Sequence, residues 1–282
     1  MRTRFAPSPT GPLHLGHAYS AMLAHDMARA ANGAFLLRLE DIDRSRTRPR
    51  WEALIFEDLS WLGLAWSEPV MRQSARGAAY AQALARLEAL GLTYPCACSR
   101  ADIRAALAAP QEGAPVLGPD GVVYPGTCRK NPPARREGVA IRLHMRRALE
   151  HLEDVSTLAF TETGPAHAGT HRLQAEALIG GVGDVVLARP GWGTSYHLSV
   201  VIDDAAQNIT HVIRGEDLFE ATQIHRLLQA LLGLPTPVYH HHRLIRDDAG
   251  KRLAKRDDAR AISRFRAEGL SPDDIRRLVG LE

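Results

Sequence analysis

The sequence predicts an α/β protein with a Rossmann-type, doubly wound parallel sheet that is interrupted by an inserted α+β module. Strand-like and helix-like segments alternate at the start of the chain. The sequence then becomes rich in proline and glycine between three cysteines, and the alternation of strands and helices resumes afterwards. We therefore expect a first half of the sheet domain at 1–91, an insert at 92–188, a second half at 189–256 and a short helical tail at 257–282.

The first half reads as strand, helix, strand, helix. Residues 3–6 are expected to form a strand, and a helical pattern over about 15–31 ends at Asn32-Gly33. The continuous apolar run 34–39 has the length of a buried parallel strand. Two more helices each present one apolar face, made by Trp51, Ile55, Leu59 and Leu62 and by Tyr80, Leu84 and Leu87.

The second half of the chain continues this pattern after the insert. A strand is expected at 139–143 within the insert. Further strands are expected at 199–202 and 209–213, and a helix over 218–232 should end at a glycine. In the tail, Ser271 should cap a short helix whose first residue is Pro272.

The bulk composition is that of a globular protein. The chain has 282 residues, of which 45% are apolar and 24% charged. It contains no run of roughly 18 apolar residues that could span a membrane, and its first residues lack the apolar core of a secretory signal. We therefore expect a cytoplasmic protein. A formal net charge of +3 permits a nucleic-acid partner without requiring one.

The strongest functional signal is the segment RFAPSPTGPLHLGH, which joins the first strand to the first helix. Ligands bind at the carboxyl edge of such sheets, and a helix N-terminus there attracts anions. Gly16 would let an adenine ring or a phosphate approach the backbone. His14 and His17 lie on one side of the opening turn and can donate hydrogen bonds to phosphate oxygens. A plain helix cap with two surface histidines is the simpler alternative, and the preceding residues weigh against it.

This segment resembles the HIGH signature of class I aminoacyl-tRNA synthetases, in the form found in glutamyl-tRNA synthetases. The blocks LEDID, from Leu39, and ITHVIRGED, from Ile209, match the same family in order. Its KMSKS signature has a counterpart in RLAKR at 252–256, with arginine for the first lysine and alanine for a serine. The resemblance implies the class I synthetase fold. It also implies ATP binding by His14, Gly16, His17 and Lys255, with His14, His17 and Lys255 as the catalytic residues.

A glutamate site requires two cationic groups for two carboxylates and one anion for the ammonium. Arg4 and Arg214 can each hold a carboxylate as a bidentate fork, and Glu40 can pair the ammonium. Which arginine takes the side-chain carboxylate stays open. The positions that we assign to glutamate, by charge and by the family resemblance, are Arg4, Phe5, Ala6, Pro7, Ser8, Glu40, Tyr196 and Arg214.

The resemblance covers nearly all of 3–256, and the remaining 26 residues are too few for the anticodon-binding region of a full glutamyl-tRNA synthetase. A shortened branch of the family, the glutamyl-queuosine tRNA(Asp) synthetases, has this shape. The resemblance implies activation of L-glutamate by ATP and Mg²⁺ without tRNA, and transfer to queuosine at the wobble position of tRNA(Asp), by a monomer. The alternatives are a truncated enzyme acting on the tRNA 3′ end, a nucleotidyltransferase of the wider superfamily, and an RNA-binding module with a decayed site.

Three cysteines within 33 positions, in a chain without an export signal, favour a metal site over disulfides. Three thiolates suit Zn²⁺, which takes four ligands in a closed structural site. The family resemblance supplies a tyrosine as the fourth ligand, and Asp102, Asp120 or water are alternatives. The run His240–His242 is not expected to bind a metal, because successive strand residues point to opposite faces. The expected zinc ligands are Cys96, Cys98, Tyr124 and Cys128.

Overall fold

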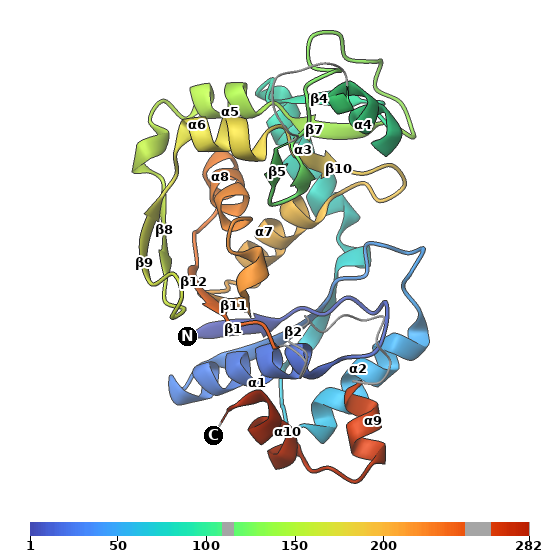
Figure 1. Ribbon diagram of the computed structural model, residues 1–282, viewed down its shortest axis with the longest axis vertical. Coiled ribbons are helices and arrows are strands. Elements are labelled where there is room, and N and C mark those ends of the chain that lie inside the picture. The colour runs from blue at the N-terminus through green and yellow to red at the C-terminus, as the bar shows by residue number, and fades with distance from the viewer. Residues whose placement is uncertain (109–115, 246–260, 282) are drawn as a thin grey trace.

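The structure is a computed structural model that describes residues 1–108, 116–245 and 261–281 (Figure 1). The expected catalytic Lys255 and its neighbours at 252–256 lie outside these ranges. The longer helices are α1 (Leu15–Ala30), α2 (Pro49–Trp61), α3 (Gly77–Ala89), α4 (Arg100–Ala108), α5 (Met145–His151), α7 (Tyr196–Ala206), α8 (Thr222–Leu232) and α10 (Pro272–Val279), with α6 (Ala175–Ala177) and α9 (Ile262–Ala267) shorter. The strands are β1 (Arg2–Phe5), β2 (Ala34–Leu39), β3 (Ser67–Arg72), β4 (Thr93–Cys96), β5 (Leu117–Gly118), β6 (Gly121–Val122), β7 (Ala140–Leu143), β8 (Ala159–Glu162), β9 (Gly169–Arg172), β10 (Val186–Ala188), β11 (His211–Gly215) and β12 (Val238–His242).

Two parallel ladders, β3-β2-β1 and β11-β12, make up the central sheet. β1 and β11 lie side by side, and the amide of Thr210 donates to the carbonyl of Arg2 at 3.0 Å where the two ladders meet. The first strand is thus in the middle of the sheet and the order reverses beside it. This is the doubly wound α/β arrangement that the sequence predicts, and its switch point lies between β1 and β11.

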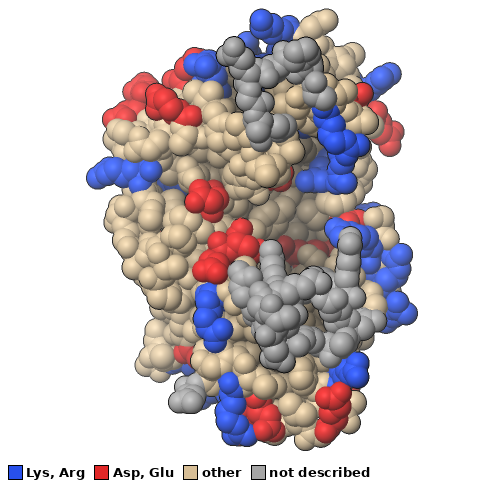
Figure 2. Space-filling view, in the orientation of Figure 1, with Lys and Arg blue, Asp and Glu red and all other residues tan. Residues whose placement is uncertain are grey.

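Two hydrophobic cores cover the two faces of this sheet. One core packs α1, α2 and α10 against β1 and β2, and the other packs α3, α7 and α8 together with the strands of the insert. In Figure 1 the first core lies below the sheet and the second above it. The space-filling view shows a hollow between these two halves (Figure 2).

The strands of the insert pair differently from the central sheet. β4, β7 and β10 form an antiparallel ladder in the order β10-β7-β4, and β5 with β6 makes a small hairpin. The hairpin of β8 and β9 does not join that ladder, because β8 pairs with β12 and extends the central sheet. The α+β character expected for this part of the chain is therefore present.

Most of the elements that the sequence predicts are present in the structure. The strand 34–39 is observed with the expected bounds, and Gly233 ends α8 in the left-handed conformation, with φ 63°. In the tail, Ser271 caps α10 through a reciprocal pair of hydrogen bonds with Asp274, and Pro272 is the first helical residue. Within the described ranges, no helix combines the length and apolar character needed to cross a bilayer.

One predicted strand is wrong. Residues 199–202 belong to helix α7, whose N-terminus is capped by Ser195 accepting from the amide of Leu198. The run of valine and isoleucine there favours a strand locally. However, α7 is buried on several sides between the sheet and α8, so tertiary packing overrides the local preference and no one-sided helical pattern marks it.

A buried carboxylate on α2 predicts a pH-dependent stability. Both oxygens of Asp58 lack a hydrogen-bond partner among the described residues, and Arg266 approaches only to 3.7 Å. Burial raises the pKa of Asp58 to about 7, although Arg266 opposes the shift. The folded chain therefore holds a proton that the unfolded chain releases near pH 4, so stability should fall as pH rises from about 4 to about 7.

We expect Asp58→Asn to remove this loss. Its thermal unfolding temperature should exceed that of the wild type by several degrees above pH 7, and the two curves should converge toward pH 4. Circular dichroism melts across that range provide the measurement, with the exposed Asp273→Asn as control. An equal difference at all pH values would contradict the assignment.

Candidate active site

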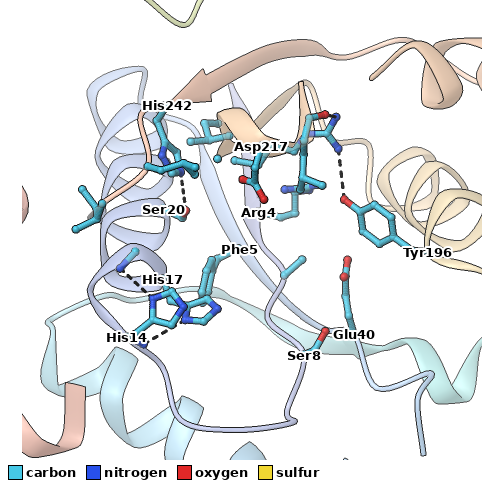
Figure 3. Close-up of a pocket in the computed structure, with 18 residues that line it drawn as sticks. Arg4, Phe5, Ser8, His14, His17, Ser20, Glu40, Tyr196, Asp217 and His242 are labelled. Carbon is cyan, nitrogen blue, oxygen red and sulfur yellow. Dashed lines mark hydrogen bonds between the residues drawn. The ribbon is translucent and has the colours of Figure 1, made fainter. Parts of the chain in front are cut away.

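One cavity of about 460 Å³ opens at the switch point of the sheet, where β1, β2, β11 and β12 end (Figure 3). It brings together almost every described residue that the sequence assigns to glutamate or ATP. Pro7 is the exception: it is buried outside the lining, and its carbonyl accepts from the amide of Glu40 at 3.0 Å. The predicted residues on the wall are Arg4, Phe5, Ala6, Ser8, His14, Gly16, His17, Glu40, Tyr196 and Arg214.

The two histidines of the signature lie close together at the start of α1, with their ring planes tilted by 36°. Their ring centroids are 3.8 Å apart. Nδ1 of His14 accepts from the amide of Gly16, and Nδ1 of His17 accepts from the amide of His14, both at 3.1 Å. Since Nδ1 is the acceptor in each ring, each neutral imidazole carries its proton on Nε2. A side chain at residue 16 would press on the ring of His14, because an added Cβ would lie 3.1 Å from Cε1.

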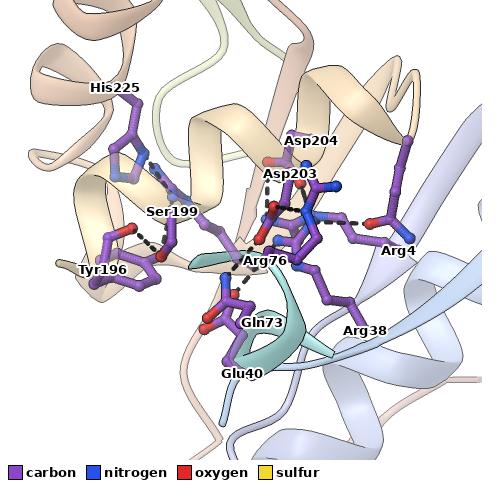
Figure 4. A network of polar contacts seen from close by, with 12 residues as sticks. Arg4, Arg38, Glu40, Gln73, Arg76, Tyr196, Ser199, Asp203, Asp204 and His225 are labelled. Atoms are coloured by element: carbon purple, nitrogen blue, oxygen red, sulfur yellow. Dashed lines mark hydrogen bonds and ion pairs between the residues drawn. The ribbon is translucent and has the colours of Figure 1, made fainter. Parts of the chain in front are cut away.

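Behind the cavity, a buried carboxylate on α7 fixes two arginines from the sheet (Figure 4). Asp204 accepts from Nε of Arg4 at 3.0 Å and from Nη1 of Arg38 at 2.7 Å. Burial alone would raise the pKa of Asp204, but the two guanidiniums hold it below its usual value. Nη1 of Arg4 takes no part in these bonds. Asp204 therefore orients the Arg4 guanidinium through two of its three nitrogens, Nε and Nη2.

Glu40 lies beside Ser8 at the end of β2 (Figure 3). Burial raises the pKa of this carboxyl, even though Arg38 and Arg4 pull it down. Its nearest ion-pair contact among the described residues is Nη2 of Arg38, at 3.4 Å. A carboxylate held so loosely in a buried place is suited to a cationic group of a ligand.

Arg214 is held from several sides at the end of β11. Its Nη2 donates to the Thr222 hydroxyl at 2.8 Å and to the carbonyl of Leu218 at 3.1 Å. Nε donates to His241 at 2.9 Å, and Nη1 to His225 at 3.1 Å and to the Tyr196 hydroxyl at 3.4 Å. The contact with Tyr196 is the longest of these, so it is the one that a substrate carboxylate would displace most easily.

The histidines around Arg214 have defined tautomers. A guanidinium only donates, so Nδ1 of His225 accepts, and its Nε2 donates to Nδ1 of His197 at 3.1 Å. Nε2 of His197 then faces Asp120 of the insert at 3.5 Å. Burial lowers the pKa of His225 far below its usual value, and Arg214 adds to the effect. A chain of side-chain contacts thus joins Asp120 of the insert to Arg214.

The three histidines of β12 make separate contacts. His241 is buried and its Nδ1 lies 2.5 Å from Glu162, while Nε2 of His242 meets the Ser20 hydroxyl at 2.6 Å. His240 instead contacts Thr163. The three rings do not converge, and no described residues near them form a metal-binding group.

The sequence did not lead us to several residues of the site. Ser20, Asp217 and His242 line the cavity, and Arg38 and Asp204 lie behind it. Asp217 ends the ITHVIRGED block, so the motif itself could have identified it. Asp204 follows Asp203 on α7, and a pair of adjacent acids in an apolar run was the available signal.

The three cysteines of the insert converge. The sulfurs of Cys96, Cys98 and Cys128 lie within 4.8 Å of one another, at the base of a small apolar cluster. The Tyr124 hydroxyl lies 3.3 Å from two of these sulfurs. No described carboxylate joins the group; Asp102 instead accepts from the amide of Ser99 at 2.8 Å. Three thiols with one phenol oxygen fit a tetrahedral zinc site, and Tyr124 is the better fourth ligand by position.

Comparison with known proteins places this site in context. A family model for class I tRNA synthetases (E and Q), catalytic domain, matches residues 1–116 and 172–281. A glutamyl-Q tRNA(Asp) synthetase from Rhodobacter capsulatus is 65% identical over 285 residues, covering the whole of both chains. A protein of the same name from Symbiobacterium thermophilum is 42% identical, covering 96% of this chain and 83% of its own.

Solved structures share the fold. A glutamate tRNA ligase from Elizabethkingia meningosepticum, determined in complex with its amino acid, superposes with a TM-score of 0.69 at 27% identity. The chain covers 53% of that ligase, so it spans about half of its length. A methionyl-tRNA synthetase from Mycobacterium tuberculosis is similar in fold alone, with a TM-score of 0.60 at 12% identity.

Proposed function

Since this chain belongs to the class I tRNA synthetases of the E and Q type, within them to the glutamyl-Q tRNA(Asp) synthetases, we propose that it activates L-glutamate with ATP, without tRNA, and transfers it to queuosine of tRNA(Asp). Membership makes the chain a ligase of the aminoacyl-tRNA synthetase type. The proposed reaction takes place in the cytoplasm.

The observation that carries the proposal is that one cavity has two ends of different chemistry. Its wall carries Arg4, Glu40, Arg214 and Tyr196. Together they supply the two cations, the one anion and the hydroxyl that a dicarboxylic amino acid requires. We assign one glutamate carboxylate to Nη1 of Arg4 and the other to Arg214 with Tyr196. Glu40 pairs the ammonium.

The other end of the cavity suits the nucleotide. The Nε2–H groups of His14 and His17 donate to the phosphates of ATP, and Lys255, outside the described residues, adds a cation. The α-carboxylate of glutamate attacks the α-phosphorus, pyrophosphate leaves, and glutamyl-adenylate forms. A queuosine hydroxyl then attacks the acyl carbon and AMP leaves. When bound with ATP, Mg²⁺ supplies further positive charge to the phosphates.

A zinc ion in the insert would be held by Cys96, Cys98, Cys128 and Tyr124. Such a closed site has a structural role and tethers β4 to the loop that follows β6. The zinc would lie outside the cavity for glutamate and ATP, because none of its ligands lines that cavity.

A glutamate transfer assay tests the proposal. Labelled glutamate, ATP and the chain are incubated with queuosine-containing tRNA(Asp), unmodified tRNA(Asp) or tRNA(Glu). We expect transfer to the first RNA only. Transfer to tRNA that lacks queuosine, abolished by periodate treatment of its terminal ribose, would instead identify a truncated enzyme acting on the 3′ end.

The raised pKa of Glu40 predicts a pH dependence for glutamate activation. Only the ionised carboxylate pairs the ammonium, so kcat/KM for glutamate in pyrophosphate exchange should fall as pH falls through that pKa. The midpoint should lie above the value near 4.3 of an ordinary glutamate side chain. Glu40→Gln should lower kcat/KM by about 10- to 100-fold and abolish this pH dependence. The surface variant Glu52→Gln is the control, and an unchanged profile in Glu40→Gln would reject the role.

A further inference from the structure

A second cavity, of about 600 Å³, lies between the insert and the start of the second half of the sheet domain. It shares none of its lining with the first cavity. Four arginines contribute to its wall, and Figure 2 shows basic side chains gathered on the upper right of this face, where Figure 1 places β7 and β10. The four are Arg100, Arg104, Arg142 and Arg189.

Arg142 is the deepest of these cations. It is only 8% exposed, and its guanidinium lies 3.8 Å above the ring of Tyr124. Nη1 donates to the carbonyl of Asp184 at 2.7 Å, whereas Nε is buried and has no acceptor among the described residues. A buried guanidinium without an acidic partner is costly unless an anion joins it. Arg142 thus places a buried and incompletely hydrogen-bonded guanidinium on the wall, next to Cys98 and Tyr124, which also line this cavity.

Among the described residues, neither acid on the wall forms an ion pair with Arg142, although the charge of Asp120 acts on Arg142 and Arg189 from a longer distance. Asp184 is buried and already accepts from the Tyr94 hydroxyl at 2.5 Å, from Arg129 at 2.7 Å and from the amide of Met145 at 2.9 Å. Asp120, at the rim, faces His197. The exposed Arg100 and Arg104 have no ion-pair partner within the ranges the structure describes, so the basic charge remains available.

An aromatic platform stands at the edge of the same cavity. Trp192 lies on a tight loop between Gly191 and Gly193, both at positive φ, and Arg189 lies 5.5 Å from its ring centroid. Trp192 also lines a third cavity, of about 290 Å³, beside Arg44. A partly buried indole with basic side chains around it matches the way proteins hold unstacked bases of single-stranded RNA.

We propose that the second cavity binds one unpaired nucleotide of the RNA substrate. Its base stacks on Trp192, and its phosphate is held by Arg142 with Arg100 or Arg104. The proposal rests on the proposed function for the existence of an RNA substrate. It goes further by assigning a separate site to a nucleotide other than the one that accepts glutamate.

Fluorescence of Trp192 tests this directly. The chain has four tryptophans, so a variant with Trp51, Trp61 and Trp66 replaced by phenylalanine reports on Trp192 alone. Adding the anticodon stem–loop of tRNA(Asp) should quench this emission in a saturable way, because a stacked base quenches indole. A stem–loop that binds by anisotropy without quenching Trp192 would overturn the proposal.

Substitution of the proposed contact residues is the second test. Trp192→Ala should weaken stem–loop binding by about 10-fold or more, Trp192→Phe should restore most of it, and Arg104→Ala should reduce the salt slope of binding by about one. Glutamate-dependent pyrophosphate exchange should stay unchanged in all three. Trp51→Ala is a matched control, since that tryptophan also lies under an arginine, Arg50, at 4.4 Å, but lines neither of these cavities.

Failure of the proposed function can be distinguished from failure of the nucleotide site. If the wild-type chain does not transfer glutamate to queuosine but Trp192 is quenched by the stem–loop, the proposed function fails and the nucleotide site stands. If transfer succeeds and Trp192→Ala binds RNA as tightly as Trp51→Ala does, the nucleotide site is rejected and the proposed function stands.

Discussion

Replacing Arg4 by leucine should lower glutamate-dependent pyrophosphate exchange by about 100-fold or more. The substitution removes a guanidinium that lines the cavity, and truncating one partner of a buried, hydrogen-bonded charge pair costs on the order of 2–5 kcal/mol. The fold should survive, because Asp204 keeps its 2.7 Å bond to Arg38. Most of the loss should appear in KM for glutamate, and KM for ATP should change little.

Arg76→Ala is the matched control for this experiment. Arg76 also donates to an aspartate of α7, Asp203, at 2.8 Å, but it does not line the cavity. It should lose some thermal stability and little activity. Equal loss of exchange in the two variants would mean that Arg4 acts through the buried network alone and does not touch glutamate.

Removing the metal should have the second large effect. Cys128→Ser, or a strong chelator, should release zinc and loosen the segment that joins β4 to the loop after β6, since structural zinc sites contribute about 10–16 kcal/mol in small domains. We expect transfer of glutamate to RNA to fall by at least about 10-fold while pyrophosphate exchange persists, because the first cavity draws no residue from this segment.

Metal analysis and limited proteolysis would check this prediction. The purified wild type should contain one zinc per chain, and Cys128→Ser should contain almost none and be cleaved faster near 96–128. Alanine at Lys130, two residues beyond the last cysteine, serves as a nearby control. A metal-free wild type with full transfer activity would contradict a structural role for zinc.

The parts of the fold that the sequence predicted well have one-sided or uninterrupted patterns. The apolar run 34–39 and the Ser271-Pro272 cap were predictable because each is a local signal. Residues 199–202 were mistaken for a strand because α7 is buried on several sides, which erases the helical period. A local pattern cannot reveal burial that arises only when the sheet and α8 close around the helix.

The site was predictable to the extent that its residues stand in motifs. Arg4 and Arg214 lie near the ends of β1 and β11, and Glu40 directly follows β2, so strands that end at one edge bring them to one cavity. The supporting residues were less visible. His225 and His197 orient Arg214 from two helices, and nothing in their spacing distinguishes them from histidines of an ordinary core.

The position of Asp204 also has a consequence for biosynthesis. Its partners Arg4 and Arg38 precede it by 200 and 166 residues. Until α7 has been synthesised, Arg4 lacks its carboxylate partner and Arg38 has only its 3.4 Å contact with Glu40, so burying the two guanidiniums in an apolar interior is costly. The region around β1 and β2 therefore stays incompletely packed in the nascent chain until α7 has been made.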